Sequence, residues 1–366
     1  MNLQTLIESI EPLDKQAMKA AENYQIQLAK PPGSLGRLES LSIQLAGISG
    51  NIHNTMDHTH LLVFAADNGV IAESVACAPQ SVTLMQTINL TRTKTGASVL
   101  TKHFGSGLTV CDVGVNADIK EPAVLNRKIA YGTQNIAKGP AMTREQAMTA
   151  IMTGAELAMH TQADAIGIGE MGIGNTTTSS AILAVLLDAD VKVVTGRGGG
   201  VTDEGFQKKK DAIRRAIEIN QPDKNDVVDV LAKVGGFDIA AMCGAFLGAA
   251  ATHRPVVIDG FISVVAALCA VRLCPNVQPY LVPSHASYEI GYRLAMQEMK
   301  LEPIFNLGMR LGEGSGCPLA FHVLSAACSI INDMATFDQA GIDDGYLEEI
   351  REGDKFTVET EKESHT

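Results

Sequence analysis

The chain has few basic residues and no long apolar run. Its 29 Lys and Arg stand against 41 Asp and Glu, so the formal net charge is −12. Such a chain repels a polyanion unless its basic residues gather in one patch, and we expect no nucleic-acid partner. The longest apolar stretch, Phe261 to Val271, is about half of the ~20 residues that a membrane span requires, so we expect no membrane partner either.

Metal-binding and secretory signals are missing too. The seven cysteines contain no Cys-x-x-Cys pair, and no cluster of histidines is present to complete a zinc site. Residues 1–15, MNLQTLIESIEPLDK, carry acids where a secretory leader carries a basic stretch and then apolar residues. The signatures G-x-S-x-G, Walker A and H-E-x-x-H do not occur. We expect a soluble cytoplasmic protein that holds no metal.

What the chain does contain is enough apolar material for a large core, since hydrophobic residues make up 46% of its 366 residues. Six segments rich in β-branched and aliphatic residues begin at residues 61, 108, 164, 191, 255 and 277. Segments with helical periodicity, such as 143–160 and 204–220, lie between them. This alternation predicts an α/β fold with a parallel sheet covered on both faces, in which ligands bind beyond the carboxyl ends of the strands.

The two ends of the chain lack strand signals. Residues 34–49 place leucines at helical spacing, and residues 317–337 form a second apolar helical pattern. We predict a smaller helical domain from residues 1–55 and 320–342, beside a catalytic domain of residues 56–319. Residues 343–366 are rich in acids and poor in apolar side chains, which predicts a flexible acidic tail.

The strongest local signal is the glycine-rich run 167–177, GIGEMGIGNTT, which follows an expected strand and opens a helix. Glycine lets backbone amides approach an anion, and a helix N-terminus adds unpaired donors, so a phosphate site is indicated. The run also contains G-x-G-x-x-G at Gly167, Gly169 and Gly172, the dinucleotide fingerprint, although Glu170 would then face a pyrophosphate. A tight turn without a ligand is the third interpretation.

Two further loops carry polar groups. In 196-GRGGGVTDEG, Arg197 precedes a run of three lysines, 208–210, that supplies either a phosphate contact or merely a solvated helix face. In 310-RLGEGSG, Glu313 lies between glycines, where a carboxylate can enter a cleft as a general base or simply face water. Other strand ends carry side chains that suit a ribose but also cap helices: Asp67, Asn68, Asp112 and Asp259.

Seven motifs in a fixed order make the pattern specific. They are KPPGSLGRLE from residue 30, AADNGV from 65, GIGEMGIGNTT from 167, GGFDIAAMCG from 235, IDGFIS from 258, PSH from 283 and RLGEGSG from 310. From about residue 10 to 335 the chain resembles the nicotinate-nucleotide:dimethylbenzimidazole phosphoribosyltransferase family. The resemblance implies a homodimer with a Rossmann-like six-stranded sheet and a small helical domain.

The same resemblance implies a reaction. Phosphoribose would pass, with inversion, from nicotinate mononucleotide to 5,6-dimethylbenzimidazole, giving α-ribazole 5'-phosphate and nicotinate for the lower ligand of cobalamin. No cofactor is expected, because the departing pyridinium nitrogen is already cationic. The paired-acid, Thr-Thr-Gly loop with which ordinary phosphoribosyltransferases hold magnesium pyrophosphate is accordingly missing from the strand ends.

Residue roles follow from the resemblance. Glu313 would be the general base for the benzimidazole N–H, and Glu170 would stabilise the developing sugar cation. Phosphate and ribose contacts are expected from Gly172, Gly174, Asn175, Gly198, Lys209, Asp259 and Ser284, and base contacts from Pro31, Pro32, Ala78, Gln86 and Leu311.

Two positions depart from the family pattern, since the family often has His at Asn68 and Ser at Ala78, and they leave the preferred base open. Two other classes of protein compete with the transferase. One is a dinucleotide-dependent oxidoreductase built on the glycine fingerprint, and the other is a nucleotide-binding protein without activity. The presence of both Glu170 and Glu313 argues against a mere binder of an anionic nucleotide.

Overall fold

The computed structural model describes residues 1–347, which form two compact units. The first unit comprises residues 1–13 and 56–325; the second begins with residues 14–55 and resumes at residue 326. Most of the acidic segment 343–366, for which we predict flexibility, lies outside the described residues. No helix among those described has the length and apolar character needed to cross a bilayer.

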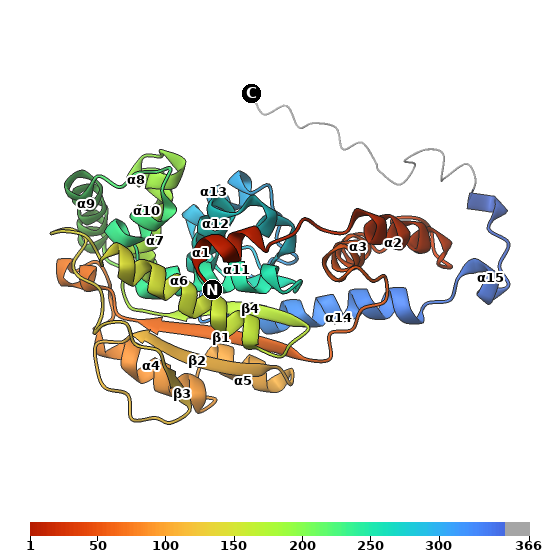
Figure 1. Ribbon diagram of the computed structural model, residues 1–366, viewed down its shortest axis with the longest axis horizontal. Coiled ribbons are helices and arrows are strands. Elements are labelled where there is room, and N and C mark those ends of the chain that lie inside the picture. Colours follow the sequence, from red (N-terminus) through yellow and green to blue (C-terminus); the bar gives the residue numbers. More distant parts are fainter. Residues whose placement is uncertain (348–366) are drawn as a thin grey trace. The chain divides into compact units, whose positions relative to one another are not determined.

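Six strands of the first unit form one parallel sheet in the order β3-β2-β1-β4-β5-β6 (Figure 1). They are β1 (Thr59–Ala66), β2 (Gly107–Gly114), β3 (Val124–Asn126), β4 (Ala165–Met171), β5 (Val256–Ile258) and β6 (Leu281–Pro283). The chain winds outward from β1 to β3 and then returns to the other side of β1 for β4. Where the winding reverses, the loops after β1 and β4 diverge and leave a crevice at the carboxyl edge. The predicted α/β fold with six parallel strands is confirmed.

One predicted strand is wrong and one strand escaped prediction. The segment from residue 191 forms the short helix α8 (Val191–Val194), because Asp190 accepts a hydrogen bond from the Lys192 amide at 2.8 Å and starts a helical turn. Val191 and Val194 are buried while Val193 is 47% exposed, a helical spacing that overrides the β propensity of valine. The sixth strand is instead β3, whose three residues pair only with β2 and carry too short a signal to recognise.

Helices cover both faces of the sheet. In Figure 1, α4 and α5 lie on one face, and α6, α7, α11 and α12 lie on the other. The helices of this unit are α1 (Leu3–Glu8), α4 (Ser81–Thr91), α5 (Gly96–His103), α6 (Arg144–His160), α7 (Asn175–Leu187), α8, α9 (Asp203–Asn220), α10 (Val227–Val234), α11 (Phe237–Ala251), α12 (Phe261–Leu273) and α13 (Ile290–Glu298), with the 3₁₀ turns η1 (Gly69–Glu73) and η2 (Pro275–Tyr280).

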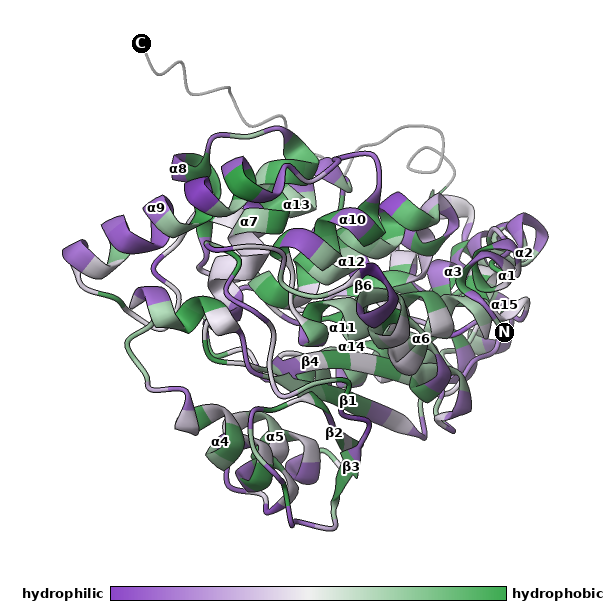
Figure 2. Ribbon diagram, turned by 60° about the vertical axis from the view of Figure 1, so that its left-hand side comes forward, coloured by the Kyte–Doolittle hydropathy of each residue, from purple (hydrophilic) through white to green (hydrophobic). Residues whose placement is uncertain are grey.

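Helix α11 lies in the core of the first unit, with most of its residues buried. Figure 2 colours α11 and α12 hydrophobic along most of their length, whereas α9 carries a hydrophilic face. Glycines bring α11 against α6: a Cβ at Gly244 would lie 1.7 Å from the carbonyl oxygen of Ile151, so only glycine allows this approach of two backbones. A core packed this tightly gives the loops at the strand ends a rigid support.

The second unit contains α2 (Lys15–Gln27), α3 (Arg37–Ser49), α15 (Phe337–Ala340) and η3 (Gly345–Leu347), while α14 (Cys317–Asp333) begins in the first unit and ends in the second. The KPPGSLGRLE motif lies here. Its last residue, Glu39, pairs with the buried Lys30 ammonium at 2.8 Å and accepts the Leu35 amide at 2.9 Å. The carboxylate of Glu39, at one end of this loop, therefore binds both the other end and the middle of the loop.

Candidate active site

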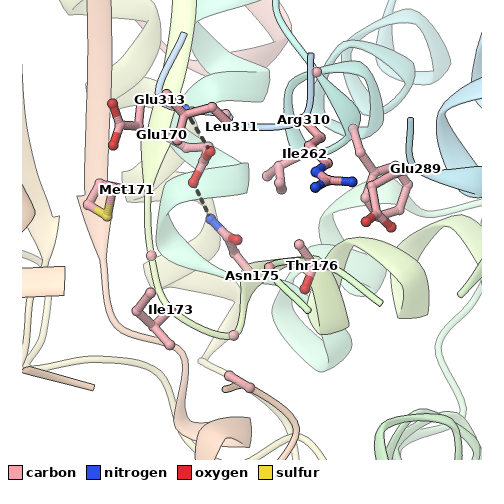
Figure 3. Close-up of a pocket in the computed structure, with 18 of the residues that line it drawn as sticks. Glu170, Met171, Ile173, Asn175, Thr176, Ile262, Glu289, Arg310, Leu311 and Glu313 are labelled. Carbon is pink, nitrogen blue, oxygen red and sulfur yellow. Dashed lines mark hydrogen bonds between the residues drawn. The ribbon is translucent and has the colours of Figure 1, made fainter. Parts of the chain in front are cut away.

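A pocket of about 260 Å³ opens at the carboxyl edge of the sheet in the first unit. Its walls come from the loops after β4 and β5, from residues 75–86, from the glycine turn at 197–201 and from two segments at 285–289 and 310–313. Figure 3 shows several of these side chains facing the same space. The pocket lies beside the point where the strand order reverses, which is where the fold predicts a ligand.

The loop after β4 brings a helix start to the pocket. Gly174, with φ of 99°, precedes α7, which has no side-chain cap, and the first two residues of α7, Asn175 and Thr176, line the pocket. A Cβ at Gly172 would lie 2.5 Å from the Ala66 carbonyl oxygen, so the chain can turn here only with glycine. This geometry suits an anion near the helix N-terminus.

The dinucleotide interpretation of this loop does not agree with the structure. Gly167 and Gly169 lie inside β4 and not in a turn. A Cβ at Gly167 would meet Cys317 at 2.5 Å, and one at Gly169 would meet the Glu313 carbonyl oxygen at 2.5 Å. These two glycines make room for α14 and for the Glu313 loop, so they do not form the turn that holds a pyrophosphate.

Glu170 is the penultimate residue of β4, and its side chain is buried in the pocket wall. Its Oε2 accepts a hydrogen bond from Asn175 Nδ2 at 2.5 Å, and its Oε1 accepts the Glu313 amide at 3.2 Å (Figure 3). Burial raises the pKa of the Glu170 carboxyl, and these two hydrogen bonds oppose the rise. The carboxylate is thus held at both oxygens in a dry environment.

Glu313 enters the pocket wall and does not face water, since it is only 3% exposed. Its backbone has φ of 62°, between Gly312 at 87° and Gly314 at 84°. For a residue with a Cβ this left-handed conformation costs about 1–2 kcal/mol. Glu313 Oε2 accepts the Ala97 amide at 3.3 Å, at the N-terminus of α5, where the helix dipole favours a negative charge. Burial raises the pKa of the Glu313 carboxyl against this stabilisation.

Asp259, after β5, anchors the Glu313 loop. Its Oδ2 accepts the Gly314 amide at 3.0 Å and its Oδ1 accepts the Gly316 amide at 2.7 Å. Burial raises the pKa of Asp259 to about 7, and repulsion by Glu170 and Glu313 adds to the rise. Asp259 lines the pocket, but both of its oxygens already hold backbone amides.

At the end of β6 the predicted residue and the lining residues differ. Ser284 is fully buried behind the pocket wall, where its hydroxyl donates to the Asp259 carbonyl oxygen at 3.3 Å. The side chains that reach the pocket here are His285 and Ser287. Burial lowers the pKa of His285 to about 4, which keeps its ring neutral at pH 7. The PSH motif marks this strand end, but it does not show which of its residues faces the ligand.

Lys209 is buried, with only 1% exposure, whereas Lys208 pairs with Glu204 on the outer face of α9. The Lys209 ammonium donates to Thr176 Oγ1 at 2.9 Å and to the Gly196 carbonyl oxygen at 3.1 Å. Burial lowers the pKa of Lys209 to about 8, although Glu289 opposes the shift. A positive charge therefore lies directly behind Thr176, which lines the pocket.

The turn after α8 contributes Gly198 to the pocket, with φ of 58°. Gly198 contacts Thr176, because a Cβ there would lie 2.8 Å from Thr176 Oγ1. Arg197 also lines the pocket, while its guanidinium binds Asp203 and the Val201 carbonyl oxygen. The two glycine-rich turns thus meet at Thr176, although the second of them follows a helix and not a strand.

Apolar side chains form part of the pocket wall, among them Val75, Val82, Met171 and Leu311. Three of the predicted base contacts, Ala78, Gln86 and Leu311, line the pocket. Leu311 is 58% exposed. Pro31 and Pro32 belong to the second unit, and their role as base contacts stays a prediction.

Other strand-end residues serve the structure. Asp67 accepts the Asn116 amide at 2.8 Å, and Asp112 pairs with Lys128 at 2.8 Å. Asn68 is fully buried below the pocket loop, accepts the Thr178 hydroxyl at 3.3 Å and does not line the pocket. Of the two departures from the family pattern, Ala78 alone lies on the pocket wall. Within residues 1–347 no group of three or more His, Cys, Asp or Glu side chains is arranged to hold a metal.

A doubly wound parallel sheet, with buried carboxylates and a helix start around a pocket at its switch point, defines an α/β enzyme that acts on a small anionic substrate. The chain belongs to the phosphoribosyltransferase family, whose model matches residues 10–342. The resemblance seen in the ordered motifs is therefore confirmed.

Similar proteins match over nearly the whole chain. A nicotinate-nucleotide–dimethylbenzimidazole phosphoribosyltransferase of Clostridium perfringens (strain ATCC 13124) is 47% identical over 359 residues, which covers 97% of this chain and 99% of that protein. A protein of the same name from Alkaliphilus metalliredigens is 49% identical over 344 residues, covering 93% and 99%. The crystal structure of the enzyme of this name from Thermus thermophilus has a TM-score of 0.86 at 36% identity and covers 91% of this chain and 100% of that chain.

Proposed function

We propose that this chain transfers the 5-phosphoribosyl group of nicotinate mononucleotide to 5,6-dimethylbenzimidazole. The products are nicotinate and α-ribazole 5'-phosphate, the precursor of the cobalamin lower ligand. Near-complete coverage of relatives with this name supports the reaction. The observation in the pocket that carries it is Glu313, a buried carboxylate between an apolar wall and a helix start.

Glu313 is the general base of this proposal. As one nitrogen of the benzimidazole attacks the anomeric carbon, the N–H on the other nitrogen becomes acidic and its proton passes to the Glu313 carboxylate. A base with a raised pKa accepts that proton more readily, and burial raises the pKa of Glu313. The Ala97 amide fixes the direction of the carboxylate, so little reorganisation is needed during the reaction.

The sugar cation forms near an acidic wall. Glu170 and Asp259 line the pocket together with Glu313, and although Arg197 and Arg310 line it too, the three carboxylates in their ionised forms contribute a negative potential. The donor's pyridinium ring and the developing oxocarbenium ion are both cationic, so the potential favours them without a metal. Nicotinate then leaves as a neutral pyridine ring with its carboxylate unchanged, which needs no acid catalyst.

Phosphate binding falls to the part of the pocket around Thr176. Lys209 supplies the charge through Thr176, and the turns at Gly174 and Gly198 allow a close approach of the backbone. With the phosphate held there and the base held by Ala78, Gln86 and Leu311, the attacking nitrogen approaches opposite the nicotinate. A single displacement in this arrangement inverts the anomeric carbon.

A two-substrate assay tests the proposal. The protein is incubated with nicotinate mononucleotide alone and with 5,6-dimethylbenzimidazole added, and nicotinate and the new nucleotide are followed by chromatography. Nicotinate release is expected only when both substrates are present, and proton NMR of the product should show the α anomer. Release of nicotinate at the same rate without the base, or a β product, contradicts the proposal.

Assembly and compartment are also proposed. We infer a homodimer, because Met85 on α4 and Val99 on α5 are exposed apolar side chains that a second copy can cover. The mass in solution, measured by light scattering, should be twice the 38.7 kDa of the chain. All seven cysteines are free, which suits a reducing cytoplasm.

A further inference from the structure

A fully buried carboxylate lies below the pocket and outside its wall. Asp238, in the first turn of α11, is 0% exposed. The charged neighbour that acts on it is another carboxylate, Glu170, and burial raises the pKa of Asp238 to about 7. Burying a carboxyl group is costly for a fold unless hydrogen bonds compensate, so its presence at this position calls for a reason.

The partner of Asp238 is the side chain of Asn175. Asn175 Nδ2 donates to Asp238 Oδ2 at 2.9 Å and to Glu170 Oε2 at 2.5 Å. When both groups are ionised, their oxygens only accept hydrogen bonds, so the amide nitrogen and not the amide oxygen lies between them. Both of its hydrogens are used, and the Asn175 side chain has one orientation that satisfies both neighbours.

Asp238 itself has no freedom to move. A Cβ at Gly172 would lie 2.7 Å from Asp238 Oδ2, and a Cβ at Gly236 would lie 2.4 Å from Oδ1. The carboxylate is therefore wedged between two glycine backbones on a helix that forms the core of the unit. Because its position is fixed, Asp238 can hold more exposed groups of the pocket in place through hydrogen bonds.

These contacts form one continuous path to the general base. Asn175 joins Asp238 to Glu170, and Glu170 Oε1 accepts the backbone amide of Glu313 at 3.2 Å (Figure 3). The left-handed backbone of Glu313 is strained and needs such support. Loss of the Asp238 contact would free the Asn175 amide to rotate and would loosen Glu170 in turn.

We propose that Asp238 is a positioning residue for the transfer reaction, which acts through Asn175 on the carboxylate of Glu170 and on the backbone of Glu313. The inference rests on the proposed function, because Glu170 and Glu313 have their roles only in that reaction. Asp238 is buried and does not line the pocket, so it should affect the rate of the chemical step more than the binding of either substrate.

Steady-state kinetics of Asp238→Ala test this role. We expect kcat to fall about 10- to 100-fold, the effect of a displacement of roughly 1 Å at a reacting group. The KM values for both substrates should stay within about 2-fold. Asp238→Asn keeps an oxygen that accepts from Asn175 and should recover most of the loss. Wild-type kcat in a folded Asp238→Ala protein, or no recovery in Asp238→Asn, overturns the proposal.

A double-mutant cycle with Asn175 examines the path itself. If Asp238 acts through Asn175, then Asp238→Ala should lower kcat by less than about 2-fold in an Asn175→Ala background, and independent, multiplying effects would refute the path. Ser179→Ala is the matched control, since Ser179 is also buried on α7 and should leave kcat unchanged. Should Asp238→Ala fail to fold, Asp238→Ser, too short to reach Asn175, carries the same expectations.

Failure of the positioning role and failure of the proposed function give different results. A wild-type protein that releases no nicotinate refutes the function itself. An active wild-type protein whose Asp238 variants are folded and equally fast refutes only the positioning role.

Discussion

Replacement of Glu313 by Gln is the most direct test of the chemistry. Gln has the shape of Glu, and its side-chain oxygen can still accept the Ala97 amide at the start of α5. The left-handed backbone and the buried position are unchanged. The variant therefore loses the ability to take a proton and little else.

The size of the loss follows from what the carboxylate does. General-base catalysis contributes about 10²- to 10⁴-fold, so kcat of Glu313→Gln should fall by that factor, or about 3–5 kcal/mol of transition-state stabilisation. Folding should change little: the lost attraction to the helix dipole is worth about 0.3–1 kcal/mol, and relief of a buried charge opposes it. KM for either substrate should stay within a few-fold.

The assay follows nicotinate release at saturating concentrations of both substrates, with thermal melting to confirm the fold. Glu218→Gln, an exposed glutamate on α9, is the control for the mere loss of a negative charge and should behave as wild type. Turnover of Glu313→Gln within about 3-fold of wild type would show that this carboxylate is not the base. A Glu313→Gln variant that fails to fold would instead contradict the expectation that Gln keeps the backbone conformation at this position.

Three further changes probe other parts of the site. Lys209→Met keeps the buried volume but removes the charge, so KM for nicotinate mononucleotide should rise about 10- to 100-fold while kcat changes little; a pure kcat effect would exclude a phosphate role. Gly314→Ala forces a Cβ into the left-handed region and to 2.5 Å from Leu61, and should lower the unfolding free energy by about 2–5 kcal/mol in urea titrations; an unchanged midpoint would show that the loop can relax. Because burial raises the pKa of Asp238 to about 7, the folded protein binds more protons than the unfolded chain between about pH 4 and 7, and this group's contribution to stability falls as pH rises through that window. The melting temperature of Asp238→Asn minus that of wild type should therefore increase from pH 4 to pH 8. If this difference in melting temperature does not change with pH, the pKa of Asp238 is not raised by burial.

The sequence was sufficient for those parts of the molecule whose local pattern matches their environment. Glu170 lies near the end of a continuous apolar strand and Asn175 follows that strand, and this order alone predicts a polar site at its carboxyl end. The segment beginning at Val191 could not be assigned correctly, because three valines with β propensity become part of a helix once Asp190 supplies a cap. For so short an element, the packing of the neighbours decides and the intrinsic preference does not.

Roles within the site were harder to predict than its location. The sequence places Asp259 and Ser284 at strand ends. It cannot show that both carboxylate oxygens of Asp259 accept hydrogen bonds from the Glu313 loop, or that Ser284 points away from the pocket. Asp238 lies in the GGFDIAAMCG motif, but a single acid at a helix start is usually a cap, so the motif did not reveal its role. Its relation to Glu170 exists only across elements that are far apart in the sequence.

The conformation at position 313 has a consequence for the evolution and engineering of this enzyme. Glycine would occupy that site with less strain, so selection for heat resistance alone is expected to favour a substitution that removes the proposed general base. Consensus or stability-guided redesign of the chain should therefore hold this position fixed. The proposed general base thus occupies a position at which its own backbone conformation lowers the stability of the fold.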